Sequence, residues 1–140
     1  MKTLFCPKFD LSMSSARVST GLLLLRLVAG IAFILHGVPK LAAPFAWMGP
    51  DAPIPGIFQA LAVLAEVGGG AALILGLLVP LASLGLIFTM VGAVSYHLSK
   101  GDGFVQGYEL ALVYLAISIL LFLSGPGKFS LDHVIKTRKK

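Results

Sequence analysis

The sequence predicts an all-α integral membrane protein, an antiparallel four-helix bundle with both termini in the cytoplasm. Composition is the first reason, because the 140 residues are 57% hydrophobic and only 12% charged, whereas soluble domains carry about 25% charged residues. The second reason is that the apolar residues form four runs near the length of about 20 residues that a helix needs to cross a bilayer core. These runs are Leu22–Leu41, Ile57–Leu78, Leu81–Leu98 and Tyr108–Leu123.

The third reason is the distribution of positive charge. Lysines and arginines gather at the two ends of the chain, at Lys2, Lys8, Arg17, Lys128, Lys136, Arg138, Lys139 and Lys140. Short basic flanks stay on the cytoplasmic side of a membrane, and four spans place both ends on that side. We therefore interpret the net charge of +5 as a topology signal that also contacts anionic lipid headgroups. A docking site for a partner protein is the alternative, and nucleic-acid binding is excluded.

Residues 1–20 have no hydrophobic periodicity and are predicted to be a flexible cytoplasmic tail. The first helix follows from about Gly21, and its apolar run is longer than the core of a signal peptide, so we expect it to be retained. The loop 42–56 cannot be helical throughout, because it contains several prolines and glycines, namely Pro44, Gly49, Pro50, Pro53, Pro55 and Gly56. It is long enough to fold back over the mouth of the bundle, and Trp47 with Phe45 suits an interfacial anchor.

The second and third runs are separated by little more than Val79–Pro80, which predicts a tight helical hairpin. The loop 99–107 is rich in glycine and is predicted to be irregular. The fourth helix stops at the Gly125-Pro126-Gly127 sequence, which completes a single four-helix domain over residues 21–124. In the basic cytoplasmic tail 125–140, Ser130 is a candidate N-cap for a short helix on the membrane surface.

The single cysteine, Cys6, limits the chemistry of the chain. An intrachain disulfide needs two cysteines. A membrane dithiol–disulfide oxidoreductase that works with its own cysteine pair is therefore excluded.

Among the polar and charged side chains within the runs or at their edges, seven are candidates for chemistry: Arg26, His36, Lys40, Glu66, His97, Tyr108 and Glu109. Ionisable groups at membrane depth are costly and usually face the interior of a bundle. With the N-terminus inside, a rise of 1.5 Å per residue places most of them in the outer half of the bundle. A buried Glu66 needs a cation or a proton, and we predict that Arg26 pairs with it.

Two further interpretations concern the histidines. His36 and His97 invite comparison with axial haem ligands on facing helices, and His36, His97 and Glu109 could in principle hold a metal ion. The spacing supports neither arrangement specifically, so no metal ligand is assigned. The glycines inside the runs, such as Gly30, Gly37 and Gly70, are predicted to let helices approach closely, the alternative being close contact with a cofactor.

Several short motifs in a fixed order resemble the DoxX family. They are His36-Gly37-x-x-Lys40-Leu41 closing the first run, Glu66-x-x-Gly69-Gly70 in the second, His97 late in the third, Tyr108-Glu109 opening the fourth, and Gly125-Pro126-Gly127-x-x-Ser130-Leu131-Asp132 after it. Arg26 also stands where that family usually has an arginine. The resemblance covers residues 20–134.

The resemblance implies a multi-pass protein of a bacterial-type inner (plasma) membrane. It also implies an oxidoreductase component, since related subunits belong to a thiosulfate–quinone oxidoreductase of sulfur-oxidising archaea. A redox role without a cysteine pair would need a borrowed carrier, most naturally a membrane quinone. The candidate catalytic residues are then His36, Glu66, His97 and Glu109, and the candidate substrate-binding residues are Arg26, Lys40 and Tyr108.

Three hypotheses follow. The first is a quinone-linked subunit of a redox complex, with a polar pocket in the outer half of the bundle and a redox-enzyme partner subunit. The second is a non-catalytic membrane anchor or assembly protein for a redox or stress-response complex. The third is a small-molecule carrier, which four helices favour less unless the protein forms a homo-oligomer.

Overall fold

The computed structural model describes residues 11–138, and every regular element in this part of the chain is helical. The elements in order are α1 (Leu11–Gly37), the 3₁₀ turn η1 (Val38–Ala42), α2 (Gly56–Leu64), the π-helical turn η2 (Ala65–Gly69), α3 (Gly70–Leu75), α4 (Val79–Ser99), the π-helical turn η3 (Phe104–Tyr108), α5 (Glu109–Ser124) and α6 (Leu131–Arg138). Cys6 and the other residues of 1–10 and 139–140 lie outside the described part.

The prediction of four membrane-spanning helices is confirmed. The spans are Ala16–Ala42, Gly56–Leu75, Val79–Ser99 and Phe104–Ser124. Three span limits differ from the sequence prediction: the first span begins at Ala16 rather than Leu22, the second ends at Leu75 rather than Leu78, and the fourth begins at Phe104 rather than Tyr108. Residues 11–20, which the sequence analysis assigned to a flexible tail, are helical, because α1 begins at Leu11. The second span is not one uniform α-helix, because η2 interrupts it.

The first two spans cross at glycines. A Cβ atom on Gly30 would lie 2.6 Å from the carbonyl oxygen of Gly70, and one on Gly70 would lie 2.7 Å from the carbonyl oxygen of Gly30. One level further along, a Cβ on Gly37 would lie 2.9 Å from the Cβ of Glu66. Glycines allow such backbone contact between helices, which replaces the hydrophobic driving force that lipid cannot supply. These contacts fix the register of α1 against η2 and α3.

The hairpin between α3 and α4 turns at Gly76–Leu78, slightly earlier than the sequence predicted. Gly76 ends α3 in the left-handed region, with φ of 66°. Its N–H donates to the carbonyl oxygen of Leu73, and the N–H of Leu77 donates to the carbonyl oxygen of Ala72. These two hydrogen bonds form a Schellman cap. Any side chain at Gly76 would also meet Arg26, because a Cβ there would lie 2.5 Å from Nη1.

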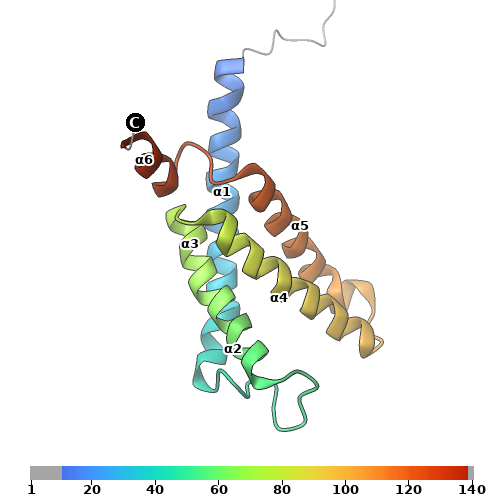
Figure 1. Cartoon of the computed structure of the whole chain (residues 1–140). Helices are drawn as coiled ribbons and strands as arrows, with labels where there is room; N and C mark the ends of the chain where they lie inside the picture. The colour runs from blue at the N-terminus through green and yellow to red at the C-terminus, as the bar shows by residue number, and fades with distance from the viewer. Residues whose placement is uncertain (1–10, 139–140) are drawn as a thin grey trace, which may run out of the picture.

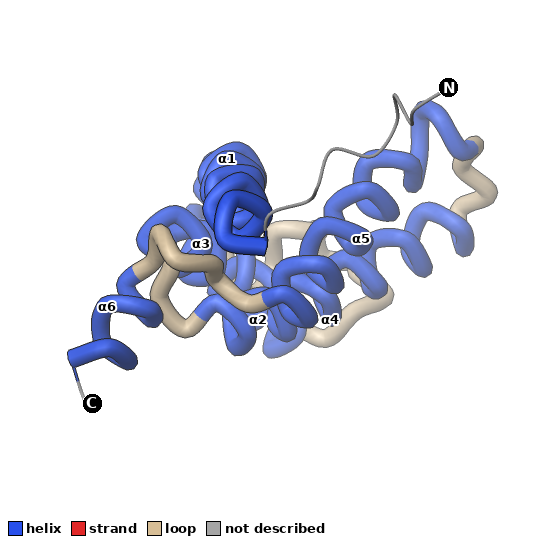
Figure 2. The backbone as a smooth tube through the Cα atoms, turned by 90° about the horizontal axis from the view of Figure 1, so that it is seen from above, coloured by secondary structure: helices blue, strands red, loops and turns tan. Residues whose placement is uncertain are grey.

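The four spans do not form a closed, parallel-sided bundle. Figure 1 shows α1 beside α2 and α3, while α4 and α5 lean away from α1 toward the loop 100–103. Seen from above in Figure 2, α1 is almost end-on while α4 and α5 extend sideways. The spans therefore separate at the end that carries η1 and the loop 43–55, and this separation opens the cleft described below.

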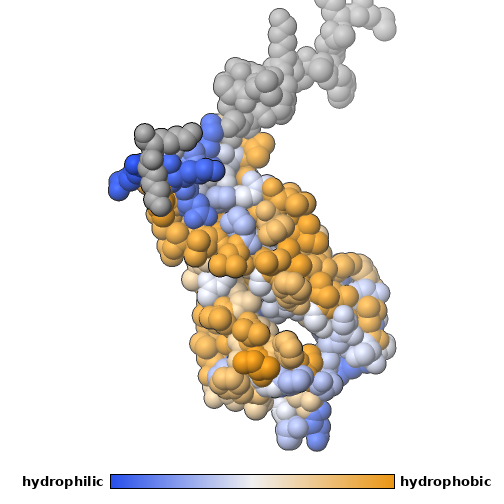
Figure 3. All heavy atoms as spheres, in the orientation of Figure 1, coloured by the Kyte–Doolittle hydropathy of each residue, from blue (hydrophilic) through white to orange (hydrophobic). Residues whose placement is uncertain are grey.

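Much of the outer surface is apolar. Leu35 is 69% exposed and Leu123 is 76% exposed, and Figure 3 shows a hydrophobic surface over most of the helices, with hydrophilic residues at the two ends. Soluble monomers rarely expose such large apolar patches. The protein would sit in a lipid bilayer, with these side chains against the acyl chains.

The glycine crossing provides a test of helix register. We expect Gly30→Ala to lower the stability of the protein in mild detergent by about 1–3 kcal/mol, because the added methyl group must displace the backbone of α3. Gly21→Ala is the matched control on the same helix, since a Cβ at Gly21 meets nothing within 4 Å. The control should be neutral or stabilising by up to about 1 kcal/mol. Equal melting temperatures of the two variants would contradict the crossing.

Candidate functional site

A largely apolar cleft of about 1120 Å³ separates the α1–α2–α3 side of the molecule from α4 and α5. Figure 3 shows the surface hollowed on this face, below the middle of the molecule. Its polar and aromatic lining residues are Phe33, His36, Lys40, Trp47, Phe58, Glu66, Phe88, Thr89, Tyr96, His97 and Tyr114. A cavity of this size, apolar with a few polar groups at defined positions, is the usual form of a site for a hydrophobic ligand.

An ion pair between Lys40 and Glu66 lies in the wall of the cleft. The Nζ atom of Lys40 donates to both carboxylate oxygens of Glu66, at 2.7 Å each. The side chain of Glu66 is only 4% exposed and that of Lys40 is 21% exposed. An ammonium group has three N–H donors, so one donor remains after these two bonds.

Two local irregularities bring this pair together. Glu66 belongs to η2, where the π-helical turn changes the direction of the side chains relative to the preceding α2. Lys40 belongs to η1, a 3₁₀ turn with Pro39 at its start, where proline is tolerated because the first N–H groups need no partner. Insertions of π-helix are frequent at functional sites.

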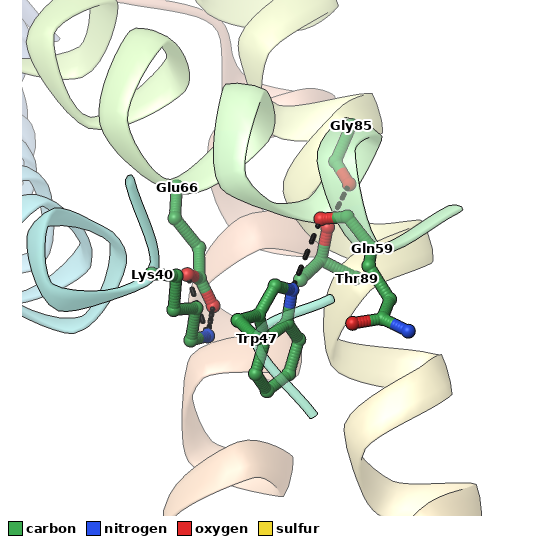
Figure 4. Close-up of polar contacts among 6 residues, drawn as sticks. All are labelled: Lys40, Trp47, Gln59, Glu66, Gly85 and Thr89. Atoms are coloured by element: carbon green, nitrogen blue, oxygen red, sulfur yellow. Dashed lines mark hydrogen bonds and ion pairs between the residues drawn. The ribbon is translucent and has the colours of Figure 1, made fainter. Parts of the chain in front are cut away.

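The loop 43–55 folds back over the mouth of the cleft, as the sequence suggested. The Nε1 of Trp47 donates to the carbonyl oxygen of Gln59 at 3.2 Å, and the Nζ of Lys40 lies 4.4 Å from the centre of the Trp47 ring (Figure 4). The Oε1 of Gln59 accepts from the N–H of Met48, and its Nε2 donates to the carbonyl oxygen of Ile54. Trp47 therefore covers the ion pair, and its role as an interfacial anchor stays a prediction.

His36 and His97 line the same cleft but differ in their contacts. His97 Nδ1 lies 2.7 Å from the Oδ2 of Asp102, in the loop after α4. Among the described residues, His36 has no hydrogen-bond partner, and its ring lies edge-on to that of Tyr114 at 6.2 Å. A metal site would need at least three His, Cys, Asp or Glu side chains close together, and residues 11–138 contain no such cluster.

The predicted Arg26–Glu66 pair was wrong. Arg26 is fully buried near the middle of α1, where Nη1 and Nη2 donate to the carbonyl oxygens of Pro126 and Phe129 at 2.6 and 2.5 Å. The register of the glycine crossing explains the error. It places Glu66 level with Gly37, which lies about 16 Å along α1 from Arg26 at 1.5 Å per residue. An arginine side chain does not span that distance.

The remaining candidates lie outside the cleft. Tyr108 contacts Phe104 edge-on, with ring centres 5.3 Å apart, and Glu109 stands in the first turn of α5, where the helix dipole favours a carboxylate. Nearby, a hydrogen bond with the Tyr96 side chain raises the pKa of Lys100. Of the seven predicted residues, four line the cleft, namely His36, Lys40, Glu66 and His97.

Sequence reasoning missed Gln59 and Asp102. Gln59 is 3% exposed and fixes the loop over the cleft through three hydrogen bonds. A lone amide inside an apolar run was a usable signal, because a polar group at membrane depth needs partners. Asp102 carried no comparable signal, since a carboxylate in a glycine-rich loop is unremarkable until the turn brings it back to His97.

The chain is similar to several bacterial proteins. It is 30% identical to the uncharacterized membrane protein Rv3486 of Mycobacterium tuberculosis, over 81% of this chain and 80% of that protein. It is 34% identical to an uncharacterized protein of Haemophilus influenzae, over 78% and 86% of the two chains. It is 30% identical to the inner membrane protein YqjF of Escherichia coli, over 84% and 94%.

No solved structure matches the chain significantly. The family model DoxX matches residues 21–98, which include the glycine crossing, the Lys40–Glu66 pair and His97. Together with four apolar spans and relatives that are themselves described as membrane proteins, this match identifies the chain as a membrane protein that belongs to the DoxX family.

Proposed function

We propose that this protein is a quinone-binding membrane subunit of a redox complex, and that the cleft between the helix pairs holds the quinone. The observation that carries the proposal is the combination of a cleft of about 1120 Å³ with apolar walls and a buried ion pair at its covered end. An isoprenoid tail fits apolar walls that face the bilayer, and a ring with two carbonyl oxygens needs hydrogen-bond donors. The third N–H of Lys40 and the ring of His36, both lining the cleft, are the donors that we assign to these oxygens.

Reduction of a quinone to a quinol takes two electrons and two protons. His97 is a suitable group for proton exchange, because a carboxylate that holds one ring nitrogen leaves the other nitrogen oriented for transfer. Asp102 provides that carboxylate at 2.7 Å. The electrons would come from a partner subunit, since the chain has no cysteine pair of its own.

Binding of a short-chain ubiquinone to the purified protein in detergent tests the proposal. We expect His36→Ala to weaken binding about tenfold, the effect of losing one hydrogen bond worth about 1.4 kcal/mol. Ala93→Trp should abolish binding, because Ala93 lines the cleft and the indole would fill it.

Val91→Trp is the matched control for the second variant. Val91 lies on the same helix, is 46% exposed and is not part of the cleft, so this variant should bind the quinone as the wild type does. Equal affinities of the wild type, His36→Ala and Ala93→Trp would contradict a quinone site in the cleft.

A non-catalytic anchor or assembly protein is the second candidate. The observation that favours it is that three of the polar groups at the bundle interior are already paired within the chain, Lys40 with Glu66 and Arg26 with two backbone carbonyls. Such groups would hold the helices together without chemistry. In that case no quinone binds, and a copurifying redox or stress-response partner keeps its activity when His36 or His97 is replaced.

The basic ends lead us to propose that both termini face the cytoplasm of an inner membrane. The cleft, the Lys40–Glu66 pair and the loop 43–55 then lie in the outer half of the bilayer. A domain over residues 21–124 with a basic cytoplasmic tail after it is the organisation we propose. The small buried core and open cleft leave room for a partner subunit or a second copy of the chain.

A further inference from the structure

A second, smaller pocket lies at the opposite end of the molecule from the cleft mouth. It has a volume of about 660 Å³ and is formed by α1, the start of α4, the segment after α5, and α6. Its lining residues are Val18, Ser19, Leu22, Pro80, Ser124, Pro126, Gly127, Lys128, Asp132, His133 and Lys136. Pro126, Gly127 and Asp132 belong to the motif that follows the fourth span, but the proposed quinone site does not use this pocket.

The pocket is built on a fixed frame. The N–H of Lys128 donates to Oγ of Ser19 at 3.3 Å, which holds the segment after α5 against α1. Ser130 caps α6 by accepting from the N–H of His133 at 3.2 Å, as the sequence predicted. Arg26 holds the carbonyl oxygens of Pro126 and Phe129 from beneath.

Two lysines supply uncompensated positive charge. Lys128 and Lys136 line the pocket, and neither has an ion-pair partner within residues 11–138. The carboxylate of Asp132 forms no ion pair with either lysine, and its two oxygens accept from the N–H groups of Leu78 and Val79 at 2.9 and 3.1 Å. Asp132 is the sole acidic side chain lining the pocket, and its charge acts on the buried Arg26, so the charges of the two lysines remain in excess.

Exposed apolar side chains stand next to this charge. Phe129 is 52% exposed, and Leu131, Val134 and Ile135 of α6 are each more than two-fifths exposed. Figure 3 shows the hydrophilic surface around α6 directly above the hydrophobic band of the bundle. A short helix with apolar side chains beside lysines, at the edge of such a band, has the arrangement of a helix that lies in the lipid headgroup region.

We propose that this pocket binds the phosphate headgroup of an anionic phospholipid. The phosphodiester would lie between Lys128 and Lys136, and the acyl chains would run down beside the exposed side chain of Phe129. Basic pockets between the ends of transmembrane helices take such headgroups. A free phosphate would meet the same lysines but would leave the neighbouring apolar surface uncovered, which is why the ligand is assigned to the lipid.

The test measures binding of phosphatidylglycerol to the purified full chain in a neutral detergent, by native mass spectrometry and by the rise in melting temperature. The wild type should bind phosphatidylglycerol in preference to phosphatidylcholine. The double variant Lys128→Gln/Lys136→Gln should bind it about thirtyfold more weakly, since each lysine near a headgroup contributes about a factor of five. Lys128→Arg/Lys136→Arg should retain binding.

Two controls make the outcome decisive. Lys100→Gln, at the far end of α4, should bind the lipid as the wild type does. The melting temperatures without lipid should agree for all variants, because Lys100, Lys128 and Lys136 are exposed. Equal binding of the two lipids, or no loss in the glutamine double variant, would overturn the proposal. Stabilisation by inorganic phosphate alone equal to that by phosphatidylglycerol would overturn it as well, because the pocket would then be a site for a free anion.

Discussion

Replacing Arg26 by alanine is expected to cost about 3–5 kcal/mol of stability, the largest effect of any single change we consider. The guanidinium is fully buried and donates to the carbonyl oxygens of Pro126 and Phe129. Its removal leaves two part-buried carbonyl acceptors without this donor and a void between α1 and the segment after α5, and each loss of this kind costs about 1–3 kcal/mol. Thermal unfolding in mild detergent measures the total.

The same change should also release α6 from the bundle. Hydrogen exchange over residues 125–138 is expected to accelerate in Arg26→Ala, because the two carbonyls that position this segment lose their anchor. The hydrogen-exchange rate of Arg26→Lys should lie between those of the wild type and Arg26→Ala. An ammonium retains the charge but not the two-pronged hydrogen-bond geometry of a guanidinium. Arg17→Ala is the control: Arg17 is on the same helix but exposed, and a loss of stability there comparable to that of Arg26→Ala would contradict the assignment.

The Lys40–Glu66 pair should give the second largest effect. Lys40→Met leaves a carboxylate that is 4% exposed without a cation, and breaking a buried pair in this way costs about 3 kcal/mol. Replacing both partners, as in Lys40→Met/Glu66→Gln, removes the stranded charge, so we expect the double variant to recover most of the stability. A double-mutant cycle on melting temperature measures the coupling between the two residues.

The contact between His97 and Asp102 offers a matched comparison. Its side chains are 35% and 39% exposed, so solvent screens the interaction, and Asp102→Asn should cost no more than about 1 kcal/mol. If Lys40→Met and Asp102→Asn lowered the stability equally, the Lys40–Glu66 pair would not be the buried interaction that the geometry indicates.

The sequence by itself determined the class of the protein and the number of its spans, and it located the third span most closely. Apolar runs of membrane length can satisfy their backbone hydrogen bonds in lipid only as helices, so Leu81–Leu98 predicts α4 (Val79–Ser99) almost to the residue. The N-cap at Ser130 could also be predicted from the sequence, because the capping side chain and the helix that it caps are adjacent in the chain. The polar residues worth testing were visible too, because each stands out against its apolar neighbours.

Only the tertiary structure decided which of those polar residues meet. Depth along a helix axis did not select Lys40 over Arg26 as the partner of Glu66. The selection came from the contact of Gly30 with Gly70, which sets the register of α1, and from the turns at η1 and η2, which redirect both side chains. The cleft depends likewise on how far α4 and α5 lean from α1 (Figure 2). Helix formation follows from short-range periodicity, whereas register and inclination arise from contacts between residues distant in the chain, and no local pattern encodes those.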